Sequence, residues 1–236
     1  MKILLLQSGP EVEAVLFGSL LIGLHKRYPK CQIIWVGNPA HFELVRFNRR
    51  INDFVDINSD LNFKTLTYLH GADLCINPCR DRRARSFVSK AVASSLLGFG
   101  KDGPLNRDAI FFERVVTGAT KTNKTLLQMY YALAGLSWDG EGYGLSYYPK
   151  IKQTRLTGVF SRKHKQLDEG QERIRLPRRL LSKIDTVNKY RSVITDDHLI
   201  LRIAIALRKN VTFYSSSLPY AVEFFGRGQV VPPPAV

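Results

Sequence analysis

A buried strand, a short loop, a helix and a second buried strand follow one another at the start of the chain. Residues 3–6 (Ile-Leu-Leu-Leu) are an apolar run typical of strands covered on both faces. Residues 8–10 (Ser-Gly-Pro) break the run and predict a turn. Apolar residues at helical spacing predict one helix over 12–28, ended by Pro29, before a strand at 31–36. This β-loop-α-β unit is typical of open parallel sheets, so we expect an α/β fold.

Alternating strands and helices continue along the chain. The first part predicts helices over 38–48, 63–69, 87–97 and 125–134 and strands over 54–57 and 73–77. The second part predicts a strand at 157–160, a helix beginning near Pro177, and a strand-turn-helix-strand unit over 192–217. Residues 138–149 are typical of a linker. We therefore expect a Rossmann-like domain over 1–150 and a shorter, basic α/β lobe over 151–236.

The chain is strongly basic. Its 236 residues carry a formal net charge of +15, and residues 151–236 contain 16 Lys and Arg against 7 Asp and Glu. An anionic partner is expected: a phosphorylated sugar, an anionic membrane surface or a nucleic acid. Aromatic residues do not interleave with the basic stretch 162–191, which disfavours single-stranded nucleic acid.

The cysteine and hydropathy patterns narrow the class of protein. The three cysteines, Cys31, Cys75 and Cys79, have no partner spacing that would complete a zinc site, so no metal is expected. Cysteines in apolar strands fit a reducing compartment. The start of the chain is not typical of a signal peptide, and no run reaches the length of a membrane span. A cytoplasmic protein is expected.

Residues 1–29 resemble, without a gap, the N-terminus of the family 9 glycosyltransferases, the bacterial heptosyltransferases of lipopolysaccharide core assembly. The resemblance continues through residues 33–36, 38–45, 55–58, 72–78 and 123–138, and it is weak beyond residue 150. It implies a GT-B arrangement of two Rossmann-like domains, here with a shortened donor domain. It also implies inverting sugar transfer from a nucleotide-diphosphate sugar to a glycan or glycolipid, with no cofactor.

The resemblance places Glu13 on the family's catalytic aspartate. A glutamate is one methylene longer and can still deprotonate an acceptor hydroxyl. Val12 replaces a family glycine, which changes the loop that also contains the expected donor-binding residues Ser8 and Gly9. The alternative is that Glu13 is an exposed first-turn residue favoured by the helix dipole.

Basic residues at two places are expected to bind an anionic acceptor. Arg80, Arg82 and Arg83 follow the strand at 73–77, where ligands of parallel sheets bind, and guanidinium groups pair well with phosphate. Lys121 and Lys124 are further acceptor-side residues that the resemblance implies. The alternative for all five residues is ordinary surface charge.

The donor would be bound by the second lobe. Arg173 and Arg175 flank the position of a family lysine that contacts donor phosphates, and Asp197 aligns with a family aspartate. Leu199 replaces a glycine of that element, and Arg202 replaces a histidine, so Arg202 would supply charge only if it pointed at the loop. The alternative for Asp197 is that it caps the following helix.

Two functions remain open from the sequence. The first is a heptosyltransferase-type glycosyltransferase that works at the inner face of the membrane, where the basic charge suits the anionic surface. The second is a catalytically inactive relative that binds a glycan or a protein partner as a scaffold, which the substitutions and the short second lobe favour.

Overall fold

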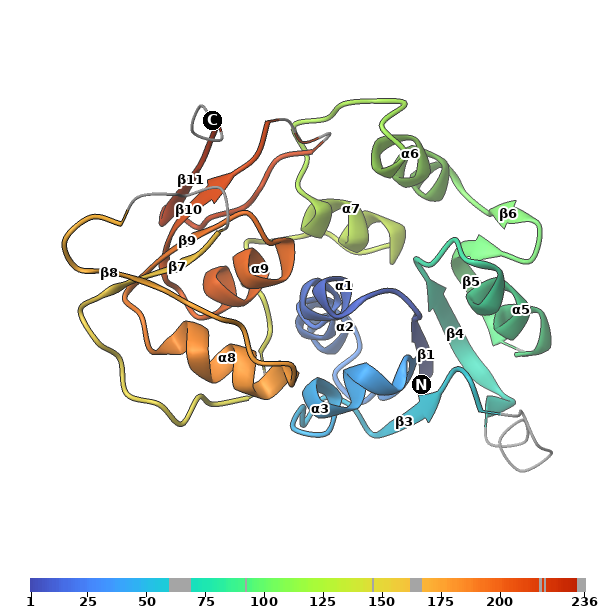
Figure 1. Ribbon diagram of the computed structural model, residues 1–236. Helices are drawn as coiled ribbons and strands as arrows, with labels where there is room; N and C mark the ends of the chain where they lie inside the picture. Colours follow the sequence, from blue (N-terminus) through green and yellow to red (C-terminus); the bar gives the residue numbers. More distant parts are fainter. Residues whose placement is uncertain are drawn as a thin grey trace.

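In a computed structural model, the chain forms two α/β domains, each built on a mainly or wholly parallel sheet (Figure 1). The structure describes residues 1–59, 69–91, 93–145, 147–161, 167–216, 218 and 220–232. The helix predicted over 63–69 lies almost entirely outside these ranges. None of the helices in the described ranges combines the length and apolar character needed to cross a bilayer.

The first sheet has six strands with β1 near its centre. Its order is β3 (Asp53–Asp56), β2 (Gln32–Gly37), β1 (Lys2–Gln7), β4 (Ala72–Asn77), β5 (Ala93–Gly100) and β6 (Gly103–Pro104). All neighbours are parallel except β5 and β6. Leu4 lies opposite Ile34 on one side and Cys75 on the other, so the apolar run that predicted β1 fills the middle of the sheet.

Each face of this sheet is covered by helices. Ile3 and Leu5 face a core formed with α1 (Glu11–Phe17), α2 (Leu20–Arg27), α6 (Arg107–Val116) and α7 (Leu126–Leu133). Leu4 and Leu6 face the opposite side and pack with α5 (Arg82–Lys90). The two-residue period of a strand explains why one apolar run can fill both cores.

The second sheet has five parallel strands. Its order is β11 (Gly228–Val231), β10 (Asn210–Tyr214), β9 (Ser192–Thr195), β7 (Thr157–Phe160) and β8 (Gln171–Arg173). Helices α8 (Leu180–Asn188) and α9 (His198–Ala206) cover it on the side that faces the first domain. The strand at 157–160 and the β9-α9-β10 unit are confirmed predictions. The expected domain boundary at residue 150 falls between α7 and β7.

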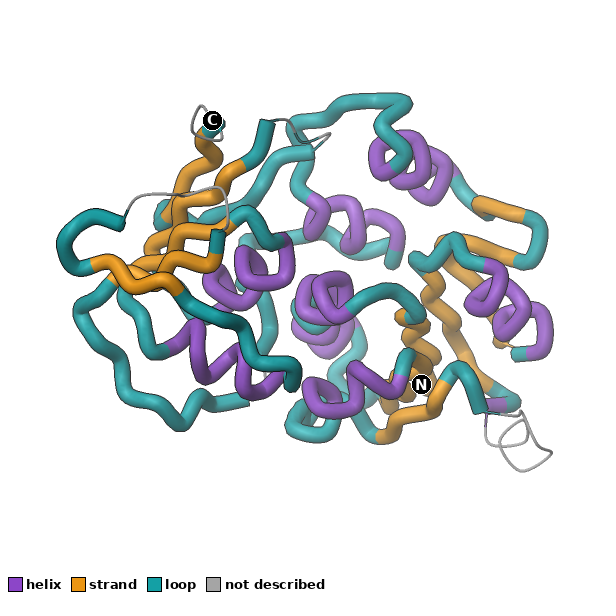
Figure 2. The backbone as a smooth tube through the Cα atoms, viewed as in Figure 1, coloured by secondary structure: helices purple, strands orange, loops and turns teal. Residues whose placement is uncertain are grey.

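The two domains pack through an apolar interface. Helices α1 and α2 lie between the sheets, with α9 beside α1, as the tube view also shows (Figure 2). Buried residues of α8, α9 and β10 belong to the same hydrophobic core as those of α1 and α7. The segment after β10 also returns to the first domain, where the Ala221 N–H donates a 3.2 Å hydrogen bond to the Lys124 carbonyl.

Two predicted helices were wrong in extent. The helix predicted over 12–28 is two helices, with a break at Gly18 and Ser19. A Cβ on Gly18 would lie 2.8 Å from the Gly144 carbonyl, so the linker crosses the helix at this break. The helix predicted through 87–97 ends at Lys90, and residues 93–100 form β5, because pairing with β4 outweighs local helical propensity.

The helix predicted over 38–48 is also shorter. It consists of a 3-10 turn, η1 (Pro39–His41), followed by α3 (Phe42–Val45). Asn38 caps it as predicted, with its side chain accepting a 3.0 Å hydrogen bond from the Ala40 N–H. This turn begins directly after β2 and brings His41 beside the loop that follows β1.

Candidate active site

The loop after β1 is tied to the loop after β4. The Ser8 N–H donates to the Cys79 sulfur at 3.2 Å, and the Ser8 hydroxyl donates to the Asp81 carboxylate. Gln7 folds back so that its side-chain oxygen accepts from the Gly9 N–H at 2.8 Å. Both loops lie at the carboxyl ends of parallel strands, where α/β proteins bind ligands.

Glu13 lies in the first turn of α1, and its side chain folds over Gly9. A Cβ on Gly9 would be 2.2 Å from Oε2 of Glu13, so only glycine leaves room for this position of the carboxylate. No side-chain hydrogen bond or ion pair of Glu13 is found within the described ranges. Glu13 is half-buried, whereas the alternative interpretation predicted an exposed residue. Its carboxylate is therefore not held by another described side chain.

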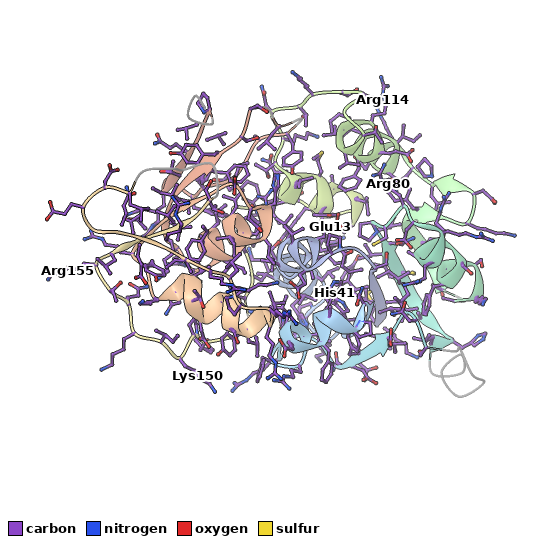
Figure 3. The ribbon with its side chains drawn as sticks, in the orientation of Figure 1. Glu13, His41, Arg80, Arg114, Lys150 and Arg155 are labelled. Carbon is purple, nitrogen blue, oxygen red and sulfur yellow. The ribbon has the colours of Figure 1, made fainter. Side chains whose placement is uncertain are left out.

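The Glu13 pocket is a cavity of about 390 Å³ that also contains Arg80. Its apolar wall comes from α6, α7 and the segment after β10, with Phe112, Tyr130 and Tyr220 among its residues. Figure 3 shows Glu13 and Arg80 in the middle of the molecule, away from the labelled Lys150 and Arg155. The cavity can hold a small polar ligand against an acid, a cation and aromatic rings.

Burial raises the pKa of Glu13, the Arg80 guanidinium partly lowers it, and the nearby Asp81 carboxylate raises it again. Desolvation disfavours the charged form of a carboxyl group, and the single cation does not fully compensate. A carboxylate with a raised pKa is a stronger base than a free one, which suits proton abstraction from a hydroxyl.

His41 is a site residue that sequence reasoning missed. It is fully buried and donates from Nε2 to the Gly9 carbonyl at 2.9 Å. Among the residues that the structure describes, Nδ1 has no hydrogen-bond partner, and burial lowers the pKa of the imidazole, which favours the neutral ring. The one sequence signal for His41 was its position after the carboxyl end of β2, where parallel sheets bind ligands. His41 fixes the backbone beneath Glu13.

A second cavity of about 560 Å³, the interdomain pocket, lies between the first loop and the start of α9. Glu11, Asp196 and Asp197 line it together with His41 and His198, and its described lining includes no Lys or Arg. Lys183 of α8 forms a 2.9 Å ion pair with Glu11 from across the domain interface. In the described part of the chain, no three His, Cys, Asp or Glu are grouped as metal ligands.

Asp197 caps α9, as the alternative interpretation held. Its Oδ1 accepts hydrogen bonds from the Leu199 N–H at 2.7 Å and the Ile200 N–H at 3.1 Å. These are two of the backbone amides that would otherwise be open to a phosphate. Leu199 also lines the pocket, where the family element has a glycine.

The arginines predicted to bind an acceptor lie at two neighbouring cavities. Arg82 and Arg83 line a wide, open cavity of about 700 Å³ together with Lys90, and Asp81 borders both this cavity and the Glu13 pocket. Arg83 also donates to the Asn58 side chain. Three basic side chains at one mouth can hold an anionic group close to Glu13.

The remaining predicted residues do not line these cavities. Lys121 and Lys124 are exposed between α6 and α7, with the Lys124 ammonium 5.4 Å from the Phe111 ring centre. Arg173 and Arg175 are exposed at the end of β8.

Arg202 does not point at the loop, which was the condition for its donor role. It is 1% exposed, and its Nη1 donates to the Tyr143 hydroxyl at 2.7 Å in the domain interface. As the middle of α9 is packed against α1, a side chain at this position is directed into the shared core.

Comparison with solved structures finds proteins with a similar fold. No protein-family model and no curated protein matches the chain. A family 9 glycosyl transferase from Veillonella parvula is similar over 98% of this chain and 85% of its own, with a TM-score of 0.73 and 11% identity. The E. coli heptosyltransferase WaaC, solved with ADP-2-deoxy-2-fluoro heptose, is similar over 98% and 93%, with a TM-score of 0.64 and 11% identity.

A third structure agrees with these two. The E. coli ADP-heptose lipopolysaccharide heptosyltransferase II is similar over 98% of this chain and 90% of its own, with a TM-score of 0.64 and 12% identity. At such low identity, similarity establishes the fold and leaves the chemistry to the site. The chain has the two-domain GT-B fold of the family 9 glycosyltransferases and heptosyltransferases, as the sequence resemblance predicted.

Proposed function

We propose that the chain is a glycosyltransferase of heptosyltransferase type, which transfers a sugar with inversion from a nucleotide-diphosphate sugar to a hydroxyl of a glycan or glycolipid. The observation that carries this proposal is Glu13, a carboxylate with a raised pKa in a cavity of the first domain that Tyr220 of the second domain also lines. Retaining such a group costs stability, which is characteristic of functional sites.

The chemical step follows from the position of Glu13. The carboxylate takes the proton of an acceptor hydroxyl, and the oxygen attacks the anomeric carbon of the donor. The bond from that carbon to the diphosphate breaks, and its electron pair leaves with the diphosphate, so the configuration inverts. No metal is needed for this proton transfer, and a general base typically accelerates such a step by about 10²–10⁴-fold.

The acceptor binds on the side of the first domain. Arg80 in the Glu13 pocket and Arg82 and Arg83 at the adjoining open cavity offer guanidinium groups to a phosphorylated sugar. The wide mouth of this cavity suits a large glycan or glycolipid. The formal net charge of +15 supports a peripheral position at an anionic inner membrane surface, with the chain in the cytoplasm.

The donor binds in the interdomain pocket. WaaC was solved with an ADP-sugar analogue, so an ADP-sugar is the first donor to test. In this chain the diphosphate would displace Glu11 from Lys183 and recruit that lysine, because the pocket lining itself is acidic. Gly9 lines both this pocket and the Glu13 pocket, and Ser8 precedes it in the same loop. Arg173 and Arg175 line neither pocket, so they would have to move from the end of β8 to reach the donor.

The test is a transfer assay that measures release of nucleoside diphosphate with ADP-sugars and phosphorylated glycan acceptors. Replacement of the base in Glu13→Gln should reduce the rate at least 100-fold, consistent with loss of a general base. The exposed Glu169→Gln is the matched control and should keep full activity. Equal rates for Glu13→Gln and the wild type would exclude Glu13 as the base.

A catalytically inactive binding or scaffold protein is the second candidate. The acidic interdomain pocket favours it, because Asp197 occupies amides of α9 and Leu199 stands where the family has glycine. Calorimetry with nucleotide-diphosphate sugars and free nucleoside diphosphates separates the two. Saturable donor binding supports the transferase. The absence of a binding heat with every donor supports a protein that binds a glycan or a partner protein.

A further inference from the structure

A separate cavity lies at the opposite end of α9 from the interdomain pocket. It has a volume of about 440 Å³, within the range of small-molecule sites. His198 at the start of α9 lines the interdomain pocket, whereas Ile205 and Ala206 at its end line this rear cavity. The nine-residue helix separates the two ends by about 13 Å at 1.5 Å per residue.

Both domains contribute to the rear cavity. Ile22 of α2 and the linker residues Gly140, Gly142 and Tyr143 form one side. The end of α9 and the connection between β10 and β11 form the other side, with Phe224, Phe225, Arg208 and Arg227. Three aromatic rings and two guanidinium groups therefore surround one hollow at the junction of the domains. Rings favour a flat apolar body, and guanidinium groups favour an anion.

The backbone around this cavity is held in an unfavourable conformation. Arg208 has φ +56° and Phe225 has φ +51°, and these are the two non-glycine residues with positive φ in the described part of the chain. Both line the rear cavity. Side chains longer than glycine cost energy in this region, and such residues concentrate at functional sites. The Arg227 side chain donates a 2.8 Å hydrogen bond to the Arg208 carbonyl and so supports the turn.

A buried positive charge lies directly behind the cavity wall. The Arg202 side chain donates a hydrogen bond to the Tyr143 hydroxyl; within the described ranges its Nε has no partner and it forms no ion pair with a carboxylate. Buried cations are normally paired. An anion in the rear cavity would lie on the far side of Tyr143 and would reduce this imbalance.

We propose that the rear cavity binds a small aromatic anion, with its ring against Phe224, Phe225 and Tyr143 and its phosphate or carboxylate group held by Arg208 and Arg227. A nucleoside monophosphate has this chemistry. Since the ligand would contact both α2 and α9, its binding would also change how firmly the domains are held together at the end away from Glu13. The site is separate from the donor pocket and does not depend on transferase activity.

Calorimetry with the Glu13→Gln protein tests the proposal without any turnover. AMP should bind saturably, whereas adenosine, which lacks the anion, and inorganic phosphate, which lacks the ring, should each bind at least 10-fold more weakly. Trp138 packs at 6.4 Å against Phe225, so its fluorescence should change with AMP. The Trp138→Phe variant should lose this signal and retain the heat of binding.

Variants locate the site. Gly142 lines the cavity, a Cβ on it would have open space around it, and its φ is not positive, so Gly142→Leu adds a bulky side chain at the cavity without backbone strain and should abolish AMP binding. Arg208→Asn keeps a residue that tolerates positive φ and should weaken binding at least 10-fold. The exposed Arg178→Gln is the control and should bind normally.

Two outcomes would overturn the proposal. Undiminished AMP binding by Gly142→Leu would mean that AMP occupies another place, such as the donor pocket. Absence of AMP binding to the parent protein, while its thermal unfolding is normal, would mean that the cavity does not take this class of ligand. Neither outcome bears on Glu13, because the transfer assay uses a different site and a different readout.

Discussion

The loops after β1 and β9 occupy equivalent places, each between the carboxyl end of a parallel strand and the first turn of a helix. They use their carboxylates differently. Asp197 accepts two backbone hydrogen bonds and caps α9. Pro10 occupies the cap position of α1 without a side-chain hydrogen bond, and Glu13, three residues further on, is left free over Gly9.

This difference separates a carboxylate that stabilises the fold from one that is available for chemistry. A capping carboxylate is solvated by backbone N–H groups and is a weak base. Glu13 has lost water without gaining such donors, so its pKa is raised. Because the pKa of Glu13 is higher in the folded state than in the unfolded state, its protonated form contributes to the free energy of unfolding. This contribution is lost as the pH rises through the folded-state pKa. Glu13→Gln should therefore unfold at the same temperature as the wild type or higher at neutral pH.

Among substitutions that leave the Glu13 carboxylate itself in place, the largest effect is expected from Gly9→Ala. The new Cβ would overlap Oε2 of Glu13, which is the far end of a flexible side chain, so the fold should survive and the carboxylate should move. Displacement of a catalytic group by about 1 Å costs roughly 100-fold in rate. We expect a loss of that order in kcat/KM, with a melting temperature close to that of the wild type.

A matched substitution at another glycine controls for backbone effects. Gly142 lines neither the Glu13 pocket nor the interdomain pocket, and a Cβ on it would have open space around it, so Gly142→Ala should leave transfer unchanged. If Gly9→Ala retained full activity, the folded-back position of Glu13 would have no role in the reaction.

Asp197→Ala should give the opposite pattern, with a loss of stability. Removal of an N-cap carboxylate costs about 1 kcal/mol, which corresponds to roughly 2–4 °C in the melting temperature of a chain of this size. Asp197→Asn retains a capping oxygen and should recover most of the loss. The exposed Asp102→Ala is the control. An unchanged melting temperature for Asp197→Ala would show that the cap is not its main contribution.

The sequence predicted the strands and helices that flank the loops after β1 and β9, but it predicted few of the residues that pack around these loops. The apolar run of β1, the turn at Ser8 and Gly9, and the Asp197 cap are local features, and each follows from neighbouring residues. The break at Gly18 depends on the Gly144 carbonyl, and the burial of Arg202 depends on Tyr143. These partners lie far along the chain, so no local pattern could reveal them.

The placement of the arginines illustrates the same limit. The cluster that begins at Arg80 was predicted as a group, but only the fold shows that Arg80 enters the Glu13 pocket while Arg82 and Arg83 line the next cavity. Arg80 precedes the capping residue Asp81, whereas Arg82 and Arg83 are the first two residues of α5. His41 was missed because its role depends on the Gly9 carbonyl, which comes from another strand's loop.

The ion pair between Glu11 and Lys183 should contribute a smaller effect. It joins the first loop to the second domain at 2.9 Å, with the two side chains 24% and 17% exposed. A double-mutant cycle with Glu11→Gln and Lys183→Met should give a coupling of about 1 kcal/mol, at the upper end for partly exposed pairs. A coupling near zero would mean that the pair does not hold the domains together. If the diphosphate recruits Lys183, Glu11→Gln should also lower the donor KM.

The smallest and most specific effect is on the pH dependence of transfer. The base must be ionised, so kcat/KM should fall as pH drops through the raised pKa of Glu13. Arg80→Gln removes the cation that lowers this pKa, so the acid limb should move to higher pH. The Asp81 side chain also caps α5 by accepting hydrogen bonds from the Arg83 and Ala84 N–H groups. Asp81→Asn removes the charge that raises the pKa of Glu13 and keeps a capping oxygen, so the limb should move to lower pH.

The two opposite signs make this measurement hard to explain by general damage to the site. If Arg80 binds the acceptor as proposed, Arg80→Gln also weakens acceptor binding, but that changes the height of the profile, whereas the position of its acid limb reports the ionisation of the free enzyme. Carbon NMR of the Glu13 carboxyl group gives the same pKa directly. Shifts in the same direction for both variants would show that the acid limb belongs to another group, and the contrast between the loops after β1 and β9 would then be structural only.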